Sequence, residues 1–221
     1  MTSPSDGRSD GQTRTYERSD SVVFLKTKET FGGLSNMAGG FSLCVNDFQI
    51  RTSEALYLAC RFPHRREVQE LIISQKSPMA AKMKSKPHRR DSRRDWFRIR
   101  VAIMRWCLRV KLAQNWDAFS GLLRETENRS IVEESRRDDF WGARPVNEYT
   151  LIGQNALGRL LMELRKVVEA EDKESLLRVE PPPDIHDFLL YGSPIEVVTE
   201  QNSTVAEPIE SSDTTPPSLF D

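Results

Sequence analysis

The chain has 221 residues, of which 38% are hydrophobic, and its formal net charge is −1. This length suffices for one domain with a hydrophobic core and polar ends. No apolar run approaches the ~20 residues that span a bilayer, and the acidic N-terminus fits neither a secretory signal nor a transit peptide. We therefore expect a cytoplasmic protein without a membrane partner.

Charge is distributed unevenly along the chain. Between Arg61 and Lys111 there are 16 Lys and Arg residues against four acidic ones, whereas from Glu171 to the end there are two against 12. A basic middle indicates an anionic ligand. Solvated helix faces also explain such runs, so both interpretations stay open.

The cysteines and histidines give no sign of a metal site. Three cysteines, Cys44, Cys60 and Cys107, lie far apart in apolar contexts, which predicts buried free thiols. The three histidines are equally scattered, and zinc sites need ligands at characteristic spacings.

Residues 1–20 offer nothing to bury and are predicted to be a disordered tail. Apolar periodicity, caps and turn residues predict a strand at 21–26, a hairpin of 41–45 and 48–51, helices at 54–62, 66–75, 79–84, 94–115 and 117–124, a strand at 131–133 and a helix at 155–168. This pattern predicts one α+β domain, dominated by helices, over residues 21–170.

The segment after the domain is acidic and rich in proline. Residues 171–196 contain the stiff spacer Pro181-Pro-Pro183 followed by an apolar stretch, which can dock back on the domain or on a partner. Residues 197–221 are predicted to be a disordered acidic tail.

Three polar clusters are candidates for chemistry. In the first, Glu54 opens a helix, where a carboxylate can also simply cap backbone amides. The second, Arg93-Arg-Asp-Trp96, also fits a cap and a core tryptophan. The third, from Ile131 to Gly158, combines acids, tryptophans and glycines. That composition suits a site that holds a planar ring against an indole and a sugar against carboxylates.

Glycoside cleavage requires such groups. The transition state at the anomeric carbon is cation-like, so nearby carboxylates stabilise it. The leaving base must be protonated or hydrogen-bonded as it departs, and arginines can hold the phosphates of the substrate.

The ordered series of motifs resembles the NADAR (YbiA-like) family. It covers about residues 22–168 and comprises Phe31-Gly-Gly-Leu-Ser-Asn36, Thr52-Ser-Glu54-Ala-Leu-Tyr57, Arg61-Phe62, Arg94-Asp95-Trp96, Ile103-Met104, Ile131-Val-Glu133, Asp139-Phe-Trp141-Gly142 and Gly153-Gln-Asn155-Ala-Leu-Gly158-Arg-Leu-Leu-Met162. The resemblance implies a YbiA-like single domain and N-glycosidase activity without a metal or redox cofactor. Family members hydrolyse riboflavin-pathway intermediates, and others remove ADP-ribose from guanine in DNA.

The residue roles of the family are assigned to the positions of this chain that match the family motifs. The resemblance implies Glu54 as the principal catalytic carboxylate, then Asp139 to orient ribose or water, and Glu133 as a third. Substrate contacts are expected from Ser35, Asn36, Arg61, Trp96, Trp141, Gly142 and Asn155, and phosphate or nucleic-acid contacts from Lys82, Lys84, Arg90 and Arg94.

The chain departs from the common pattern in one place. Many members read T-x-E-H-Y and then K-F, where this chain has Ala55-Leu56 and Arg61. If the lost histidine or lysine matters chemically, the mechanism differs. Lys82, Lys84 or Lys86 could act as a nucleophile toward an opened ribose, although phosphate contacts or solvation explain these lysines as well.

The form of the first helix and the basic stretch is similar to the subgroup paired with DNA-ADP-ribosylating toxins. This favours removal of ADP-ribose from modified guanine in DNA, with such DNA and a cognate toxin as partners. Hydrolysis of phosphorylated riboflavin intermediates and a non-catalytic module that binds ADP-ribose or nucleic acid remain as alternatives.

Overall fold

The structure is a computed structural model and describes residues 12–200. The helices are α1 (Ser53–Ala59), α2 (Arg66–Ile73), α3 (Pro78–Ser85), α4 (Trp96–Gln114), α5 (Trp116–Glu125), α6 (Ala156–Ala170) and α7 (Lys173–Leu176), with 3-10 turns η1 (Arg18–Asp20), η2 (Gly32–Leu34) and η3 (Lys86–Asp91). The strands are β1 (Arg14–Glu17), β2 (Ser21–Phe24), β3 (Leu43–Val45), β4 (Phe48–Ile50), β5 (Ser130–Glu133), β6 (Arg144–Pro145), β7 (Thr150–Gly153), β8 (Arg178–Val179), β9 (Leu189–Leu190), β10 (Ser193–Pro194) and β11 (Val198–Thr199).

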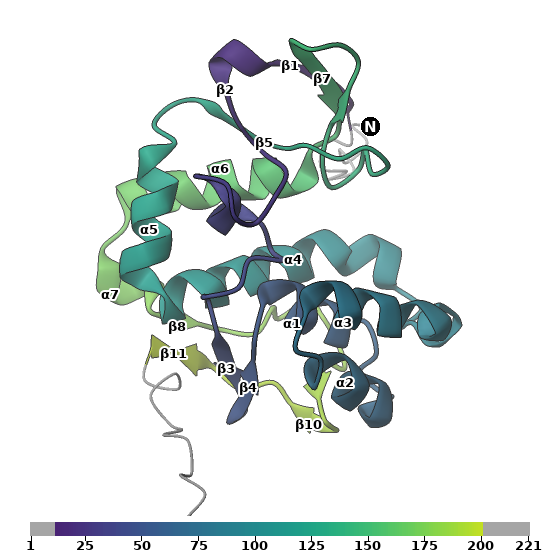
Figure 1. The fold of residues 1–221 in the computed structure, drawn as a ribbon. Helices are drawn as coiled ribbons and strands as arrows, with labels where there is room; N and C mark the ends of the chain where they lie inside the picture. Colours follow the sequence, from purple (N-terminus) through teal and green to yellow (C-terminus); the bar gives the residue numbers. More distant parts are fainter. Residues whose placement is uncertain (1–11, 201–221) are drawn as a thin grey trace, which may run out of the picture.

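Helix α4 lies at the centre of the molecule. Figure 1 shows it between α6 and the strands β1, β2 and β7 on one side, and α1–α3 with the β3–β4 hairpin on the other. Its apolar residues Trp96, Ile99, Ile103, Trp106 and Val110 recur at helical spacing and are all buried. The C-terminal half of α4 is buried on nearly every face, because β3, β8, β11, α5 and α6 pack around the helix.

The strands form small separate sheets. The order β1-β7-β6 is antiparallel, whereas β2 and β5 pair in parallel, with Val22 opposite Ile131. Helix α6 follows β7 and packs on β5, and this approach is so close that a Cβ at Gly158 would collide with the carbonyl of Ile131. The parallel pair thereby presents the end of β5, with Glu133, to the middle of the molecule.

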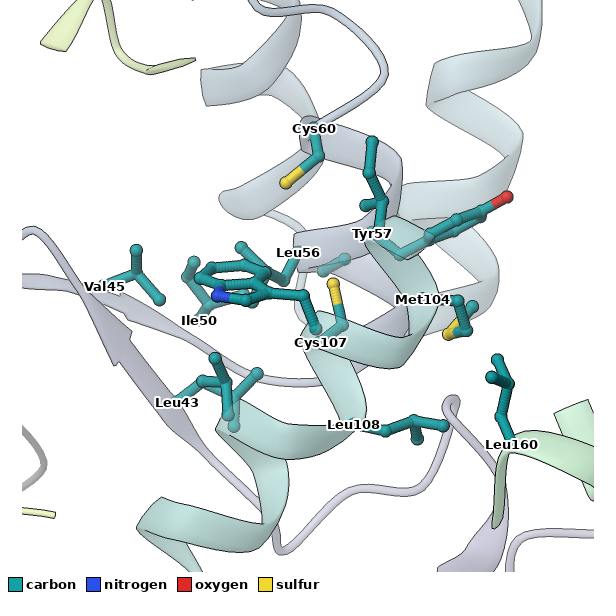
Figure 2. Packing of buried hydrophobic residues seen from close by; sticks show 14 of the residues in the cluster. Leu43, Val45, Ile50, Leu56, Tyr57, Cys60, Met104, Cys107, Leu108 and Leu160 are labelled. Carbon is teal, nitrogen blue, oxygen red and sulfur yellow. The ribbon is translucent and has the colours of Figure 1, made fainter. Parts of the chain in front are cut away.

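The main core joins α1, α4, α6 and the β3–β4 hairpin. Figure 2 shows side chains such as Leu43, Ile50, Leu56, Leu108 and Leu160 meeting in this core. All three cysteines are buried free thiols, as expected. The helix-dominated α+β fold predicted from the sequence is confirmed.

Two segments expected to lie outside the domain contribute to the fold. Residues 14–17 form β1, which pairs with β7 along its whole length, with Tyr16 buried opposite Leu151. One apolar side chain in RTYE is too weak a signal for a strand, because backbone hydrogen bonds to a distant strand hold it. The remaining residues of the expected N-terminal tail that precede residue 12 lie outside the described part of the chain.

The acidic, proline-rich extension docks back on the domain. Ile185, Phe188 and Leu190 are buried in the main core, and the Phe188 ring meets Trp106 edge-on with centroids 4.9 Å apart. Strands β8 and β11 pair with each other beside α4. The expected C-terminal tail thus begins with a strand, and its residues 201–221 lie outside the described chain. In the described range, no helix has both the length and the apolar character needed to cross a membrane.

Candidate active site

One large cavity, of about 950 Å³, opens beside the N-terminal end of α4. Its walls come from α1, α3, η3, the first turns of α4 and the segment 133–141. The lining includes Asn36, Glu54, Tyr57, Arg61, Met79, Lys82, Arg89, Arg90, Arg93, Arg94, Trp96, Phe97, Arg100, Glu133, Glu134, Asp138, Phe140 and Trp141. This volume is near the upper end of the roughly 300–1,000 Å³ of small-molecule sites.

Glu54 is held at the start of α1 by the preceding loop. Thr52 caps the helix through its hydroxyl, which accepts a hydrogen bond from the amide of Ala55. The Glu54 amide and the Ser53 hydroxyl both donate to the carbonyl of Asn36, and the Asn36 side-chain amide donates to the Glu54 carboxylate at 2.5 Å. The carboxylate is therefore oriented while being only 5% exposed.

Burial raises the pKa of Glu54, with Asp138 adding to the rise, while the charge of Lys82 and the Asn36 hydrogen bond oppose it. Glu133 ends β5 across the same cavity. Burial, with the charges of Glu54 and Asp138, raises the pKa of Glu133 to about 7. The cavity thus holds a carboxyl group that can carry a proton near neutral pH, next to a second carboxylate.

Asp138 is positioned by a tight local turn. One of its carboxylate oxygens accepts hydrogen bonds from the amides of Phe140 (3.0 Å) and Trp141 (2.9 Å). The Asp138 amide in turn donates to the Ser135 hydroxyl at 3.0 Å. This turn directs both the aspartate and the following aromatic side chains at the cavity.

Aromatic rings form a second wall. The Tyr57 ring lies 5.0 Å from Trp96 and 5.5 Å from Trp141, measured between centroids. Trp96 is buried, whereas Trp141 is partly exposed at the cavity. Such a wall can hold a planar base by stacking.

Cationic side chains also line the cavity, and two of them lie against its aromatic rings. Arg61 lies over the Trp96 ring at 5.2 Å and donates to the Ser92 hydroxyl at 2.6 Å. Arg100 lies 3.6 Å from the centroid of Phe140, and its buried Nε has no hydrogen-bond partner in the structure. Lys82, Arg89, Arg90 and Arg94 add further positive charge. These groups suit the phosphates of a substrate.

The cavity brings together most of the residues expected from the sequence. They are Glu54, Glu133, Asn36, Arg61, Trp96, Trp141, Lys82, Arg90 and Arg94. Five expected residues, Ser35, Lys84, Asp139, Gly142 and Asn155, are not part of its lining.

Asp139 faces away from this cavity. Its carboxylate lies 3.4 Å from Arg144, and it lines a separate pocket of about 380 Å³. Lys84 is exposed on α3. Asp138, the preceding residue, does line the cavity.

The other three residues support the site from behind. Asn155, fully buried, accepts from the Glu133 amide and donates to the Ile131 carbonyl, so it fixes the end of β5. A Cβ at Gly142 would collide with the carbonyl of Glu133. Ser35 accepts from the Met37 amide in the loop that carries Asn36.

A buried lysine holds that loop as well. The Lys111 ammonium donates to the carbonyls of Gly33 (2.6 Å) and Ser35 (3.1 Å) and lies 4.2 Å from the ring centroids of both Phe41 and Phe119. Burial lowers its pKa to about 7. Its position on α4 between apolar residues gave no signal for this role.

Sequence reasoning also left Met79, Phe97 and Phe140 out of the site. Phe97 and Met79 are more than half exposed at the cavity mouth, and an isolated apolar residue in a basic stretch does not distinguish an exposed position from a buried one. Among residues 12–200, no group of three or more His, Cys, Asp or Glu side chains is arranged to hold a metal ion.

Comparison with known proteins finds N-glycosidases among the relatives of this chain. N-glycosidase YbiA of Escherichia coli K12 is 30% identical over 156 residues, which cover 69% of this chain and 91% of YbiA. An N-glycosidase of Nostoc punctiforme is 28% identical over 149 residues, 66% of this chain and 92% of that protein. A riboflavin biosynthesis protein of Vibrio vulnificus is 29% identical over 175 residues, 77% of this chain, and the chain spans only 46% of its length.

The fold comparison points to the same relatives. The NMR structure of E. coli YbiA matches with a TM-score of 0.58 at 29% identity, over 75% of this chain and 91% of that one. The family model described as the NADAR domain matches residues 23–169. Because this match contains every residue that lines the cavity and covers most of the chain, the protein belongs to the NADAR domain family.

Proposed function

We propose that this protein is an N-glycosidase that hydrolyses a ribose–nitrogen bond, and that its substrate is ADP-ribosylated guanine in DNA. One observation carries the proposal. A single cavity has the buried carboxylate of Glu54 beside the half-buried one of Glu133, an aromatic wall and a cationic mouth, which match a cation-like sugar, a base and phosphates respectively. The names of the N-glycosidase relatives support the reaction class.

The carboxyl groups have distinct chemical tasks in this proposal. Glu133, whose pKa is about 7, donates a proton to the leaving nitrogen as the bond to the anomeric carbon breaks. Glu54 stabilises the positive charge on the sugar and accepts a proton from the water that attacks that carbon. The products are the restored base and a free sugar with an anomeric hydroxyl.

The cations favour a substrate with several phosphates. Arg89 and Arg90 of η3 and Arg94 before α4 line the cavity together with Arg61, Arg93 and Arg100, which is more positive charge than the pyrophosphate of one ADP-ribose would neutralise. Such a surface is suited to the backbone of a nucleic acid.

A second substrate class rests on a different observation. Relatives from Vibrio vulnificus and maize are named riboflavin biosynthesis proteins. A phosphorylated riboflavin intermediate also has a ribose–nitrogen bond to be cleaved. Its single phosphate would pair with only one of the arginines that line the cavity.

The test compares both substrates side by side. An oligonucleotide with one ADP-ribosylated guanine and a phosphorylated riboflavin intermediate are incubated with wild type and with Glu54→Gln. We expect wild type to release ADP-ribose and restore guanine, and the variant to do neither. Turnover of the intermediate alone would assign the second class, and tight binding without turnover of either would leave a binding module.

A further inference from the structure

Phe97 is the most exposed large hydrophobic side chain in the described part of the protein. Its relative exposure is 76%, and Met79, also at the cavity mouth, is 57% exposed. Burying a phenylalanine side chain is favourable, so a ring left in water forgoes that gain. A cluster of exposed apolar groups at a site usually marks a contact surface.

The helix geometry explains why the ring cannot join the core. On α4, Trp96, Ile99 and Ile103 face inward and are buried, so the next residue after Trp96 points outward. The Arg100 guanidinium lies 5.3 Å from the Phe97 ring centroid while it lies over Phe140. Phe97 therefore stands between the cavity and the solvent beside a fixed cation.

Positive charge surrounds the ring. Arg94 precedes it by three residues and Arg98 follows it directly, and both are exposed. Arg89 and Arg90 of η3 line the same mouth. Aromatic rings among arginines are the combination that binds unpaired nucleic acid, because bases stack on the rings while cations hold the phosphates.

We propose that Phe97 stacks on the nucleobase next to the modified guanine, in an unpaired stretch of the substrate strand. The inference rests on the proposed function and adds to it a contact outside the reacting nucleotide. Charge complementarity favours a nucleic acid as the occupant, because the arginines around the ring can pair with the phosphates of a nucleic acid. A protein partner would be the alternative occupant.

The first measurement compares two substrates. One is a short single-stranded oligonucleotide with one ADP-ribosylated guanine, and the other is ADP-ribosylated guanosine without neighbours. Stacking on an aromatic side chain is worth about 1–3 kcal/mol per base. Phe97→Ala should therefore lower the kcat/KM for the oligonucleotide, divided by that for the isolated guanosine, about 5- to 150-fold. Phe97→Trp should restore the ratio.

A matched control and a modified substrate sharpen the result. Tyr149 is 67% exposed away from the cavity, so Tyr149→Ala should keep the ratio of wild type. An abasic position beside the modified guanine should lower the kcat/KM of wild type on the oligonucleotide by the same factor. It should not lower the kcat/KM of Phe97→Ala any further. An unchanged ratio in Phe97→Ala, whether both kcat/KM values fall equally or neither falls, would overturn the stacking.

Binding separates this inference from the proposed function. Fluorescence anisotropy with an unmodified oligonucleotide should show weaker binding by Phe97→Ala than by wild type or Tyr149→Ala. If wild type cleaves neither modified substrate but this difference persists, the stacking stands and the proposed reaction falls. If Phe97→Ala binds as wild type does, or wild type does not bind, the stacking is wrong.

Discussion

At the scale of single residues, Glu54 combines a fixed orientation with burial. Glutamine has the same shape and can still accept the hydrogen bond from Asn36. We expect Glu54→Gln to lower kcat by about 10²- to 10⁴-fold, the usual effect of losing a catalytic acid or base. Thermal unfolding should remain near that of wild type, since no packing is lost. Near-normal turnover would remove Glu54 from the mechanism.

We expect Glu133 to make activity depend on pH. Its pKa of about 7 lies above the usual 4.5, so it stays protonated up to near-neutral pH. We expect kcat of wild type to fall as pH rises above about 7, because the proton for the leaving base is lost. Glu133→Gln should be slow at all pH values and should lack this fall. The apparent value belongs to the coupled pair of Glu54 and Glu133.

Lys111 makes stability depend on pH in the opposite direction. Its pKa is about 7 in the fold and 10.5 when unperturbed, so between these values the unfolded chain binds more protons. The free energy of unfolding should therefore rise with pH across this window, by up to about 1.4 kcal/mol per pH unit. Lys111→Met should lack the rise. Urea unfolding of both proteins at pH 7 and 9 tests this, and parallel profiles would contradict it.

At the scale of elements, the extension after residue 170 contributes to the core. Phe188 is 7% exposed and packs on Trp106. Phe188→Ala should lower the free energy of unfolding by about 3 kcal/mol, measured in urea. Val146→Ala, at a position 58% exposed, should change it by less than about 0.5 kcal/mol. Equal effects would mean that the extension does not share the core.

The elements also show how far the sequence predicts the structure. The apolar spacing of α4 and α6 predicted both helices closely, because each buries a face that recurs every three or four residues. Strands such as β8 to β11 have only two residues each. Strands β8 and β11 pair across the whole extension, and β9 and β10 pair with each other as neighbours, but two residues are too few to show an alternating pattern.

The same division applies within the site. Glu54 and Trp96 were assigned to the site from the family motifs, because a helix start by itself fits a cap or a core residue equally well. Whether Asp138 or Asp139 reaches the cavity depends on the turn in which Asp138 accepts the amides of Phe140 and Trp141. Adjacent aspartates in a loop look alike until the direction of that turn is known.

At the scale of the whole molecule, the basic side chains of residues 61–111 gather around the cavity. The cations cluster at one mouth, although the net charge is −1. Using Glu54→Gln to prevent turnover, we expect affinity for a single-stranded oligonucleotide to fall linearly on a plot of log K against log salt. Adding Arg94→Ala should reduce the slope by about 0.7. Adding Arg178→Ala, whose charge is paired with Glu180 outside the cavity, should leave the slope unchanged.

Arg93 belongs to the cavity lining and is also tied to the extension. Its guanidinium donates to the carbonyls of His186 (2.6 Å) and Asp187 (3.4 Å). When the extension opens locally, Arg93 loses these two contacts and keeps its ion pair with Asp95. By thermodynamic reciprocity, a ligand that needs Arg93 in place must then suppress that opening. Amide hydrogen exchange at residues 188–190, far along the chain from Glu54 and Glu133, thus becomes a reporter of cavity occupancy.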